Sequence, residues 1–78
     1  MSEQTYGQRL VGLSFNPSND SDVDHLKRVC ADLIDMMAQL RLTAAAAGKD
    51  DQARYASIAI TELQTTQMWL VKAITAQS

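Results

Sequence analysis

A regular heptad of apolar residues runs through residues 21–47 and constrains the fold more than any other feature of the sequence. Apolar side chains recur there at alternating spacings of three and four residues, at Val23, Leu26, Cys30, Leu33, Met37, Leu40, Ala44 and Ala47. This spacing is typical of helices that pack along a seam. Asn19, Asp20 and Ser21 are each suited to cap the start of such a helix. Because Gly48 is suited to follow its end, we predict a helix over about residues 21–47.

A second helix is predicted over about residues 52–76, which contain neither glycine nor proline. Its apolar stripe also alternates between four and three residues, at Ala56, Ile60, Leu63, Gln67, Leu70 and Ile74. Asp50 or Asp51 would cap this helix. Since the connection between the two helices is so short, they must run antiparallel. The predicted fold is therefore all-α, with a long antiparallel helical hairpin over residues 20–78.

Residues 1–19 differ in character and are predicted to form a short N-terminal arm and loop. Their apolar residues are separated by Gly7 and Gly12, and the segment from Asn16 to Ser18 contains the single proline of the chain. Proline ends a helix because it lacks the backbone N–H and fixes φ. We expect the arm to lie against the open end of the hairpin and to include a short helical turn.

The two helices carry more apolar surface than a single contact between them can cover. Ile34 and Met36 lie outside the first stripe, and Ile58, Met68 and Trp69 lie outside the second. Apolar surface left in water costs about 25 cal/mol per Å², and a two-helix chain of 78 residues seldom folds alone. We therefore predict that hairpins assemble into a helical homo-oligomer.

Composition excludes several functions. The chain has 7 Lys and Arg against 9 Asp and Glu, a net charge of −2, which disfavours a binder of DNA. One cysteine and one histidine cannot form a Cys-rich or two-histidine metal site within one chain, and Cys30 is expected to be a buried small side chain. No apolar run approaches the roughly 20 residues of a membrane span. Without a glycine-rich phosphate loop or a paired nucleophile and base, we predict no enzyme, no cofactor and no metal.

The residues suited to binding are concentrated in two places. Lys27 and Arg28 are the only adjacent basic pair, and Phe15 precedes them on the loop. A ring beside cationic groups offers a nucleotide both a stacking face and charge for its phosphate. The alternative is a hydrophobic staple at Phe15 and a solvated basic face. On the second helix, Arg54, Thr61 and Gln64 form a polar side next to the apolar stripe, which could equally face solvent.

The second helix resembles the closing helix of small phage proteins that sequester signalling nucleotides. The resemblance is carried by residues 54–73, RYASIAITELQTTQMWLVKA, with an arginine and an aromatic residue first and an Ile-Ala pair, a threonine and a Leu-Gln pair after them. These sponges inhibit CBASS, the cyclic-oligonucleotide-based antiphage signalling system of bacteria. A related hairpin occurs in an anti-Thoeris sponge. The resemblance extends over about residues 12–75.

The resemblance implies a hexamer of helical hairpins that sequesters cyclic nucleotides without cleaving them, in the cytoplasm of an infected bacterial host. It implies that Phe15 and Lys27 hold a cyclic dinucleotide of the cyclic GMP-AMP type between protomers. Arg28, the other member of the basic pair, is expected to contribute to the same site. Tyr6 is an alternative source of the stacking ring. It further implies a cyclic trinucleotide site at Arg54, to which the family positions at Thr61 and Gln64 could contribute. The alternative function is an oligomeric helical adaptor that binds a protein partner.

Overall fold

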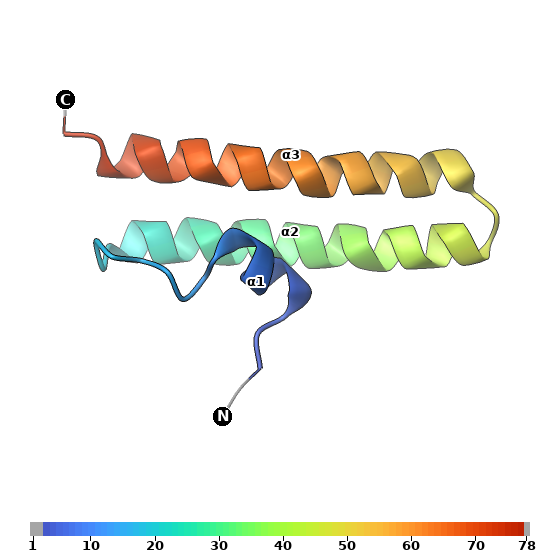
Figure 1. The fold of residues 1–78 in the computed structure, drawn as a ribbon, viewed down its shortest axis with the longest axis horizontal. Coiled ribbons are helices and arrows are strands. Elements are labelled where there is room, and N and C mark those ends of the chain that lie inside the picture. Colours follow the sequence, from blue (N-terminus) through green and yellow to red (C-terminus); the bar gives the residue numbers. More distant parts are fainter. Residues whose placement is uncertain (1–2, 78) are drawn as a thin grey trace.

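The computed structural model describes residues 3–77 and contains three helices in this part of the chain (Figure 1). They are α1 (Tyr6–Val11), α2 (Ser21–Ala46) and α3 (Asp50–Thr75). The two long helices lie side by side and antiparallel, joined by a tight turn, and α1 crosses α2 near its middle (Figure 1). The predicted all-α hairpin is confirmed. None of the helices described is long and apolar enough to cross a membrane.

The ends of α2 are determined by local capping. Asp20 is the N-cap residue, and its side chain accepts a hydrogen bond of 2.8 Å from the backbone N–H of Asp22. At the other end, Gly48 has a φ of 73°, and the N–H of Lys49 donates to the carbonyl of Ala44 over 2.8 Å. This left-handed glycine with a backward hydrogen bond is the Schellman motif, which satisfies the last helical carbonyls.

The start of α3 differs from the prediction. Its N-cap is Lys49, which makes no side-chain capping bond, and the helix begins at Asp50 rather than at residue 52. Asp50 and Asp51 therefore lie in the first turn and do not cap. Carboxylates in a first turn still interact favourably with the positive end of the helix dipole. The Schellman turn thus leads directly into α3.

The seam predicted for α2 is half wrong. The buried residues of α2 are Val23, Lys27, Cys30, Ala31, Ile34 and Ala44. The predicted seam position Leu33 is 41% exposed, whereas its neighbour Ile34 is fully buried. Leu26 and Leu40 are only half-buried and Ala47 is exposed. A heptad that contains Val23 and Cys30 can continue through Leu33 or through Ile34, which lie on different sides of α2. Helix α3 packs on the side that carries Ile34.

The stripe predicted for α3 holds for most of the helix. Ala56, Ile60 and Gln67 are buried, but Leu70 is 41% and Ile74 36% exposed. A straight helix drifts relative to a strict seven-residue repeat. In the last turns the half-buried position is consequently Val71 rather than Leu70.

Helix α1 is docked on α2 through a very close backbone approach. A Cβ atom placed on Gly7 would overlap the carbonyl oxygen of Ala31. The N–H of Gly7 donates to Oδ1 of Asp35 over 2.7 Å, and a capping box between Thr5 and Gln8 starts the helix. The expectation for the arm was therefore only partly right. Helix α1 lies over the middle of α2, and only the loop that follows it reaches the open end (Figure 1).

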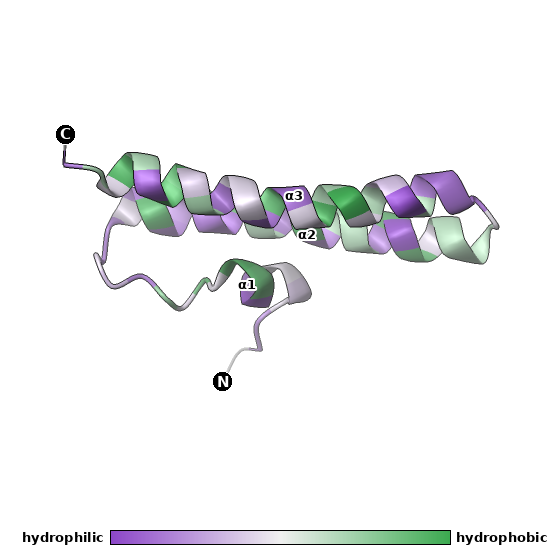
Figure 2. Ribbon diagram, turned by 45° about the horizontal axis from the view of Figure 1, so that its top comes forward, coloured by the Kyte–Doolittle hydropathy of each residue, from purple (hydrophilic) through white to green (hydrophobic). Residues whose placement is uncertain are grey.

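The molecule is thin, and much apolar surface stays exposed. The Cα atoms extend 47 × 34 × 12 Å, and α1 covers only part of one side of the hairpin (Figure 1). The core is a small cluster of Val11, Cys30, Ala31, Ile34 and Ile60. Hydrophobic residues are nevertheless distributed along both long helices (Figure 2). A stable domain normally buries its apolar faces between at least two layers.

Candidate functional site

A pocket of about 490 Å³ lies between the loop after α1 and the open end of the hairpin. We call it the Lys27 pocket. It is lined by Val11, Phe15, Asn16, Pro17, Ser18, Val23, Lys27, Gln67, Met68, Val71 and Thr75. The antiparallel pairing brings Lys27 of α2 and Val71 of α3 to the same pocket. Six of these residues are apolar and five are polar or charged, and small-molecule sites combine apolar walls with such polar groups.

Lys27 is a buried cation held by the loop. Its side chain is only 5% exposed. Its Nζ donates to the carbonyl oxygen of Gly12 over 3.0 Å and also to the carbonyl oxygen of Phe15. An ammonium group has three donors, so one remains for a ligand. Because both partners are neutral carbonyls, the positive charge at the pocket is not cancelled by a carboxylate.

Phe15 places an exposed ring beside this cation. The ring centroid is 5.7 Å from Nζ of Lys27, and the side chain is 71% exposed. That exposure rules out the hydrophobic staple, which requires the ring to pack against the first turn of α2. The structure thus places Phe15 beside Lys27, the two residues that the resemblance singled out.

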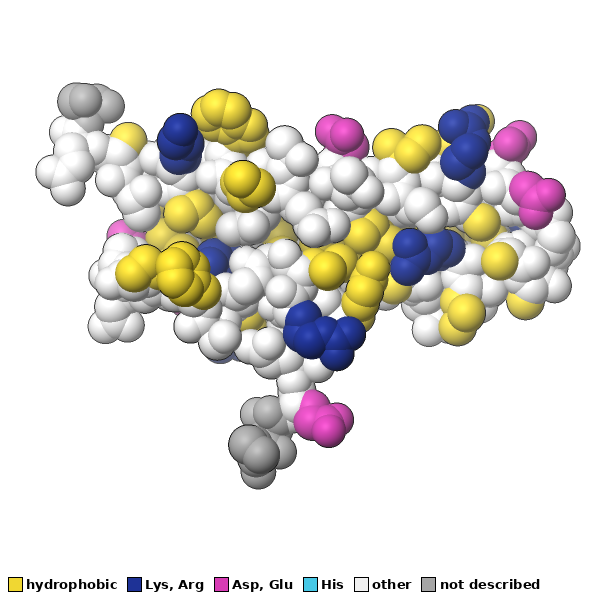
Figure 3. Space-filling model, in the orientation of Figure 1, with side chains coloured by type: hydrophobic (Ala, Val, Ile, Leu, Met, Phe, Trp, Pro, Cys, Tyr) yellow, Lys and Arg dark blue, Asp and Glu magenta, His cyan; other side chains and the backbone are white. Residues whose placement is uncertain are grey.

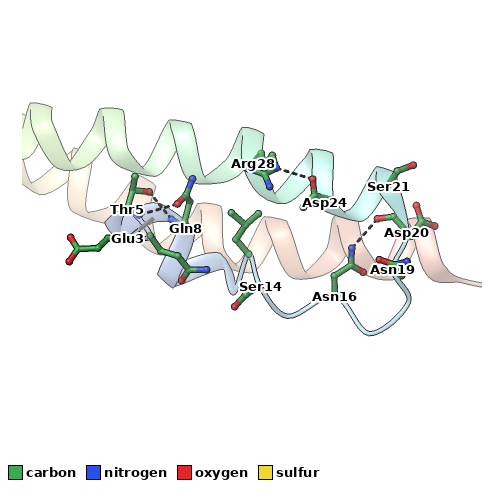
Figure 4. Close-up of a pocket in the computed structure, with 12 residues that line it drawn as sticks. Glu3, Thr5, Gln8, Ser14, Asn16, Asn19, Asp20, Ser21, Asp24 and Arg28 are labelled. Atoms are coloured by element: carbon green, nitrogen blue, oxygen red, sulfur yellow. Dashed lines mark hydrogen bonds and ion pairs between the residues drawn. The ribbon is translucent and has the colours of Figure 1, made fainter. Parts of the chain in front are cut away.

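Arg28 faces a different part of the surface. Its Nε forms an exposed ion pair of 2.8 Å with Asp24, one turn earlier on α2. Both residues line a second pocket of about 780 Å³, shown in Figure 4, which we call the Arg28 pocket. Glu3 and Asp20 also line it. Since its carboxylates outnumber its one basic side chain, this larger pocket is poorly suited to a phosphate, and Arg28 is not part of the Lys27 pocket.

Tyr6 also lies away from the Lys27 pocket. Its ring is near the guanidinium groups of Arg9 and Arg41, and the Cζ atom of each is 6.0 Å from the ring centroid. Tyr6 does not line the Lys27 pocket, so within one protomer the ring next to Lys27 is that of Phe15. Sequence reasoning did not single out Arg9 or Arg41, because no local pattern connects α1 with the distant part of α2.

The three candidates on α3 line neither of the two pockets described here. Arg54 is exposed, with its Cζ 5.0 Å from the ring centroid of Tyr55. The hydroxyl of Thr61 donates to the carbonyl of Ser57, and Nε2 of Gln64 donates to that of Ile60, each over 3.3 Å. Both polar side chains are thus engaged with the backbone of their own helix.

Gln67 is a site residue that the sequence pattern concealed. It was assigned to the apolar stripe of α3, and it is indeed only 7% exposed. Its side chain lines the Lys27 pocket and makes no hydrogen bond to other residues of the part described. A glutamine in an otherwise apolar stripe is the signal that could have indicated it. Its amide could bind the edge of a nucleobase.

The thiol of Cys30 is not placed to act as a nucleophile. Cys30 is buried in the core, and desolvation raises the pKa of its thiol. A buried thiol of raised pKa is a poor nucleophile, because the thiolate is the reactive form. No group of three or more His, Cys, Asp or Glu side chains suited to a metal ion occurs among residues 3–77.

Comparison with protein families gives a match for this chain. The model of the Acb2/Tad1 hairpin domain matches residues 8–75, which is most of the chain. The match includes Phe15, Lys27 and Gln67 and the whole of α2 and α3. No curated protein and no solved structure matches the chain significantly. The chain therefore belongs to the Acb2/Tad1 hairpin-domain family, the family of anti-CBASS and anti-Thoeris sponges that bind cyclic nucleotides rather than act as enzymes.

Proposed function

We propose that this protein is a phage-encoded nucleotide sponge that binds cyclic dinucleotides in the Lys27 pocket and releases them intact. By removing the messenger in the cytoplasm of the infected bacterium, it would block CBASS immunity. The observation that carries the proposal is the cation and exposed ring, 5.7 Å apart, at an apolar pocket in a member of this family. Cyclic GMP-AMP is the cyclic dinucleotide that we propose for the binding tests.

The pocket suits one half of such a ligand. The third N–H of Lys27 can donate to a phosphate oxygen, and charge-assisted bonds of this kind are the stronger ones. The face of Phe15 can stack on a base, and the Gln67 amide can bind the edge of that base. A volume of about 490 Å³ is within the range of small-molecule sites.

A second protomer would supply the other half. A cyclic dinucleotide has two phosphates and approximate two-fold symmetry, which a two-fold interface between hairpins can match. Two copies of Phe15 and Lys27 would then provide two stacking faces and two ammonium groups. This explains how a chain of net charge −2 binds an anion, because the positive charge is concentrated locally.

The surface of α2 supports the assembly. Its outward side carries a second apolar stripe at spacings of three and four residues, at Leu26, Val29, Leu33, Met36 and Leu40. Val29, Leu33 and Met36 are 45%, 41% and 60% exposed. Such a stripe is a coiled-coil seam without a partner in the protomer. We propose that it packs against other copies in a hexamer.

A separate site for cyclic trinucleotides is proposed at Arg54, with Thr61 and Gln64 on the same helix. Arg54 lies near the turn of the hairpin, whereas Lys27 lies near the open end (Figure 1). The 17 residues of helix that separate Ala44, opposite Arg54, from Lys27 span roughly 25 Å. One protomer therefore has room for two independent sites.

Retention of intact ligand tests the proposal. The protein is incubated with cyclic di- and trinucleotides, freed of excess ligand and denatured by heat, and the released molecules are identified by mass spectrometry. We expect intact cyclic dinucleotide from the native chain and from the control Lys49→Gln, which is in the turn. Cleaved product would indicate an enzyme. No retention would leave the oligomeric adaptor, for which exposed side chains such as Trp69, 64% exposed, provide a surface.

A further inference from the structure

Gln67 is a polar side chain that α3 buries beside the Lys27 pocket. The residue is only 7% exposed, and it lines this pocket together with Phe15 and Lys27. On the face shown in Figure 3, hydrophobic side chains gather where the loop after α1 lies beside the open end of the hairpin. Burying an amide in such surroundings without a hydrogen bond costs free energy. Gln67 therefore needs a hydrogen-bond partner.

The amide of Gln67 finds no such partner within residues 3–77. No hydrogen bond joins its side chain to another residue of that range, although the side chains of Gln64 and Thr75 on the same helix are bonded. Every side-chain nitrogen or oxygen atom of that range that is sealed from solvent does have a hydrogen-bond partner. The Gln67 amide consequently reaches solvent, and its acceptor and two donors are available to a ligand in the pocket that it lines.

The other polar side chains that line the pocket are already hydrogen-bonded to the protein. The Nδ2 group of Asn16 donates to a backbone carbonyl at the start of α2 over 3.0 Å, and its Oδ1 accepts from the hydroxyl of Ser18 over 2.9 Å. The hydroxyl of Thr75 donates to a carbonyl of its own helix over 2.8 Å. Lys27 offers donors only. Among the lining residues described, Gln67 thus supplies both an uncommitted donor and an uncommitted acceptor.

The hydrogen-bonding pattern of this amide matches adenine. Adenine presents its N6–H2 group beside N7 on one edge and beside N1 on the other, so a donor lies next to an acceptor on both. A glutamine amide can bind such an edge through two hydrogen bonds. Guanine presents two acceptors at O6 and N7, and an amide that binds its O6 and N1–H instead leaves the N2–H2 group unpaired. An unpaired polar group shielded from water lowers affinity.

We propose that Gln67 is the specificity-determining residue of the Lys27 pocket and selects adenine as the base of the cyclic dinucleotide, with the amide bound to N6 and the adjacent ring nitrogen. This inference rests on the proposed function, because it names the base that the pocket takes. Stacking on Phe15 does not select a base, since every base has a π-face. The contact of Lys27 with a phosphate carries no information on the base either. The choice of base therefore depends on Gln67.

Three ligands test the native chain by calorimetry. They are cyclic di-AMP, cyclic di-GMP and the analogue of cyclic di-AMP that lacks both 6-amino groups. We expect cyclic di-AMP to bind about tenfold more tightly than either of the others. Equal or tighter binding of either of the others would overturn the role of Gln67 and leave the proposed function standing. Binding of none of the three would overturn the proposed function together with this inference.

Two variants attribute the preference to the side chain. Gln67→Met keeps a similar length without the amide, so it should bind the three ligands alike. Gln67→Glu presents acceptors only, which match the N1–H and N2–H2 donors of guanine, so it should bind cyclic di-GMP more tightly than cyclic di-AMP. Both ligands carry the same two phosphates, so the added charge acts on them alike.

The control Gln52→Met makes the same change at an exposed position in the first turn of α3. It should keep the native preference for cyclic di-AMP, and circular dichroism should show the native helical spectrum in all three variants. If Gln67→Met keeps the tenfold preference, roughly 1.4 kcal/mol, Gln67 does not select the base. The measurement on the native chain with the analogue does not depend on the folding of any variant.

Discussion

At the residue scale, Lys27 shows how one side chain can stabilise a loop and also bind a ligand. A buried cation is costly unless its donors are satisfied. The carbonyls of Gly12 and Phe15 accept two of its three donors and thereby fix the loop that carries the ring. The cation and the ring are thus positioned before a ligand arrives. Such preorganisation lowers the entropy lost on binding.

Phe15→Ala tests the ligand site more directly than Lys27→Ala does, because the side chain of Phe15 does not hold the loop in place. The ring is 71% exposed, so its removal should leave thermal unfolding unchanged. If two protomers share one ligand, two stacking faces are lost at about 1–3 kcal/mol each. Binding of cyclic GMP-AMP should then weaken by roughly thirtyfold or more, measured by calorimetry. Lys27→Ala should lower both affinity and unfolding temperature, because two carbonyls lose their donor. Native affinity in Phe15→Ala would exclude the ring from the site.

The direction in which Gly7→Ala changes the free energy of unfolding tests the contact between α1 and α2. Alanine normally stabilises a helix relative to glycine by about 0.5–1 kcal/mol. At Gly7, however, the added Cβ would overlap the carbonyl oxygen of Ala31 and push α1 away from α2. Gly7→Ala should therefore lower the free energy of unfolding by about 1–3 kcal/mol, measured by urea denaturation. A gain in stability would show that α1 does not depend on this contact.

At the element scale, local chemistry predicted the helices better than it predicted their faces. The caps at Asp20 and Gly48 are local, so the ends of α2 follow from a few neighbouring residues. The start of α1 is local as well, because Thr5 and Gln8 form a capping box. Which side of α2 faces α3 is a tertiary choice, and a heptad that can be completed at Leu33 or at Ile34 does not determine it.

In the candidate site, too, local features could be predicted from the sequence and tertiary contacts could not. Phe15 and Lys27 could be paired from their positions before and within the first turns of α2, and the resemblance pointed to the same two residues. The burial of Lys27 could not be predicted, because it depends on carbonyls of the folded loop. The positions of Arg9 and Arg41 beside Tyr6 could not be predicted for a related reason. The two arginines are 32 residues apart in the sequence, and Arg41 comes near the Tyr6 ring only after α1 docks on α2.

At the scale of the whole molecule, a two-helix hairpin with one short helix on it cannot cover its own apolar surface. The shortest extent of the Cα atoms is 12 Å, and α1, with six residues, covers only part of α2. Each long helix consequently has an outward side, and that of α2 carries the stripe from Leu26 to Leu40. Copies that pack through this stripe would add the layer that covers it.

Substitutions at the adjacent residues Leu33 and Ile34 should distinguish folding from assembly. Leu33 is 41% exposed on the outward stripe, whereas Ile34 is fully buried in the hairpin. Leu33→Asp should retain the helical circular dichroism spectrum but reduce the mass in light scattering toward the 8.6 kDa of one chain, because a carboxylate cannot be buried in an apolar seam. Ile34→Asp should abolish the helical spectrum itself. If Leu33→Asp keeps the native mass, the outward stripe is not the interface. If the interface forms the ligand site, this variant also loses cyclic dinucleotide retention, although Phe15 and Lys27 are unchanged.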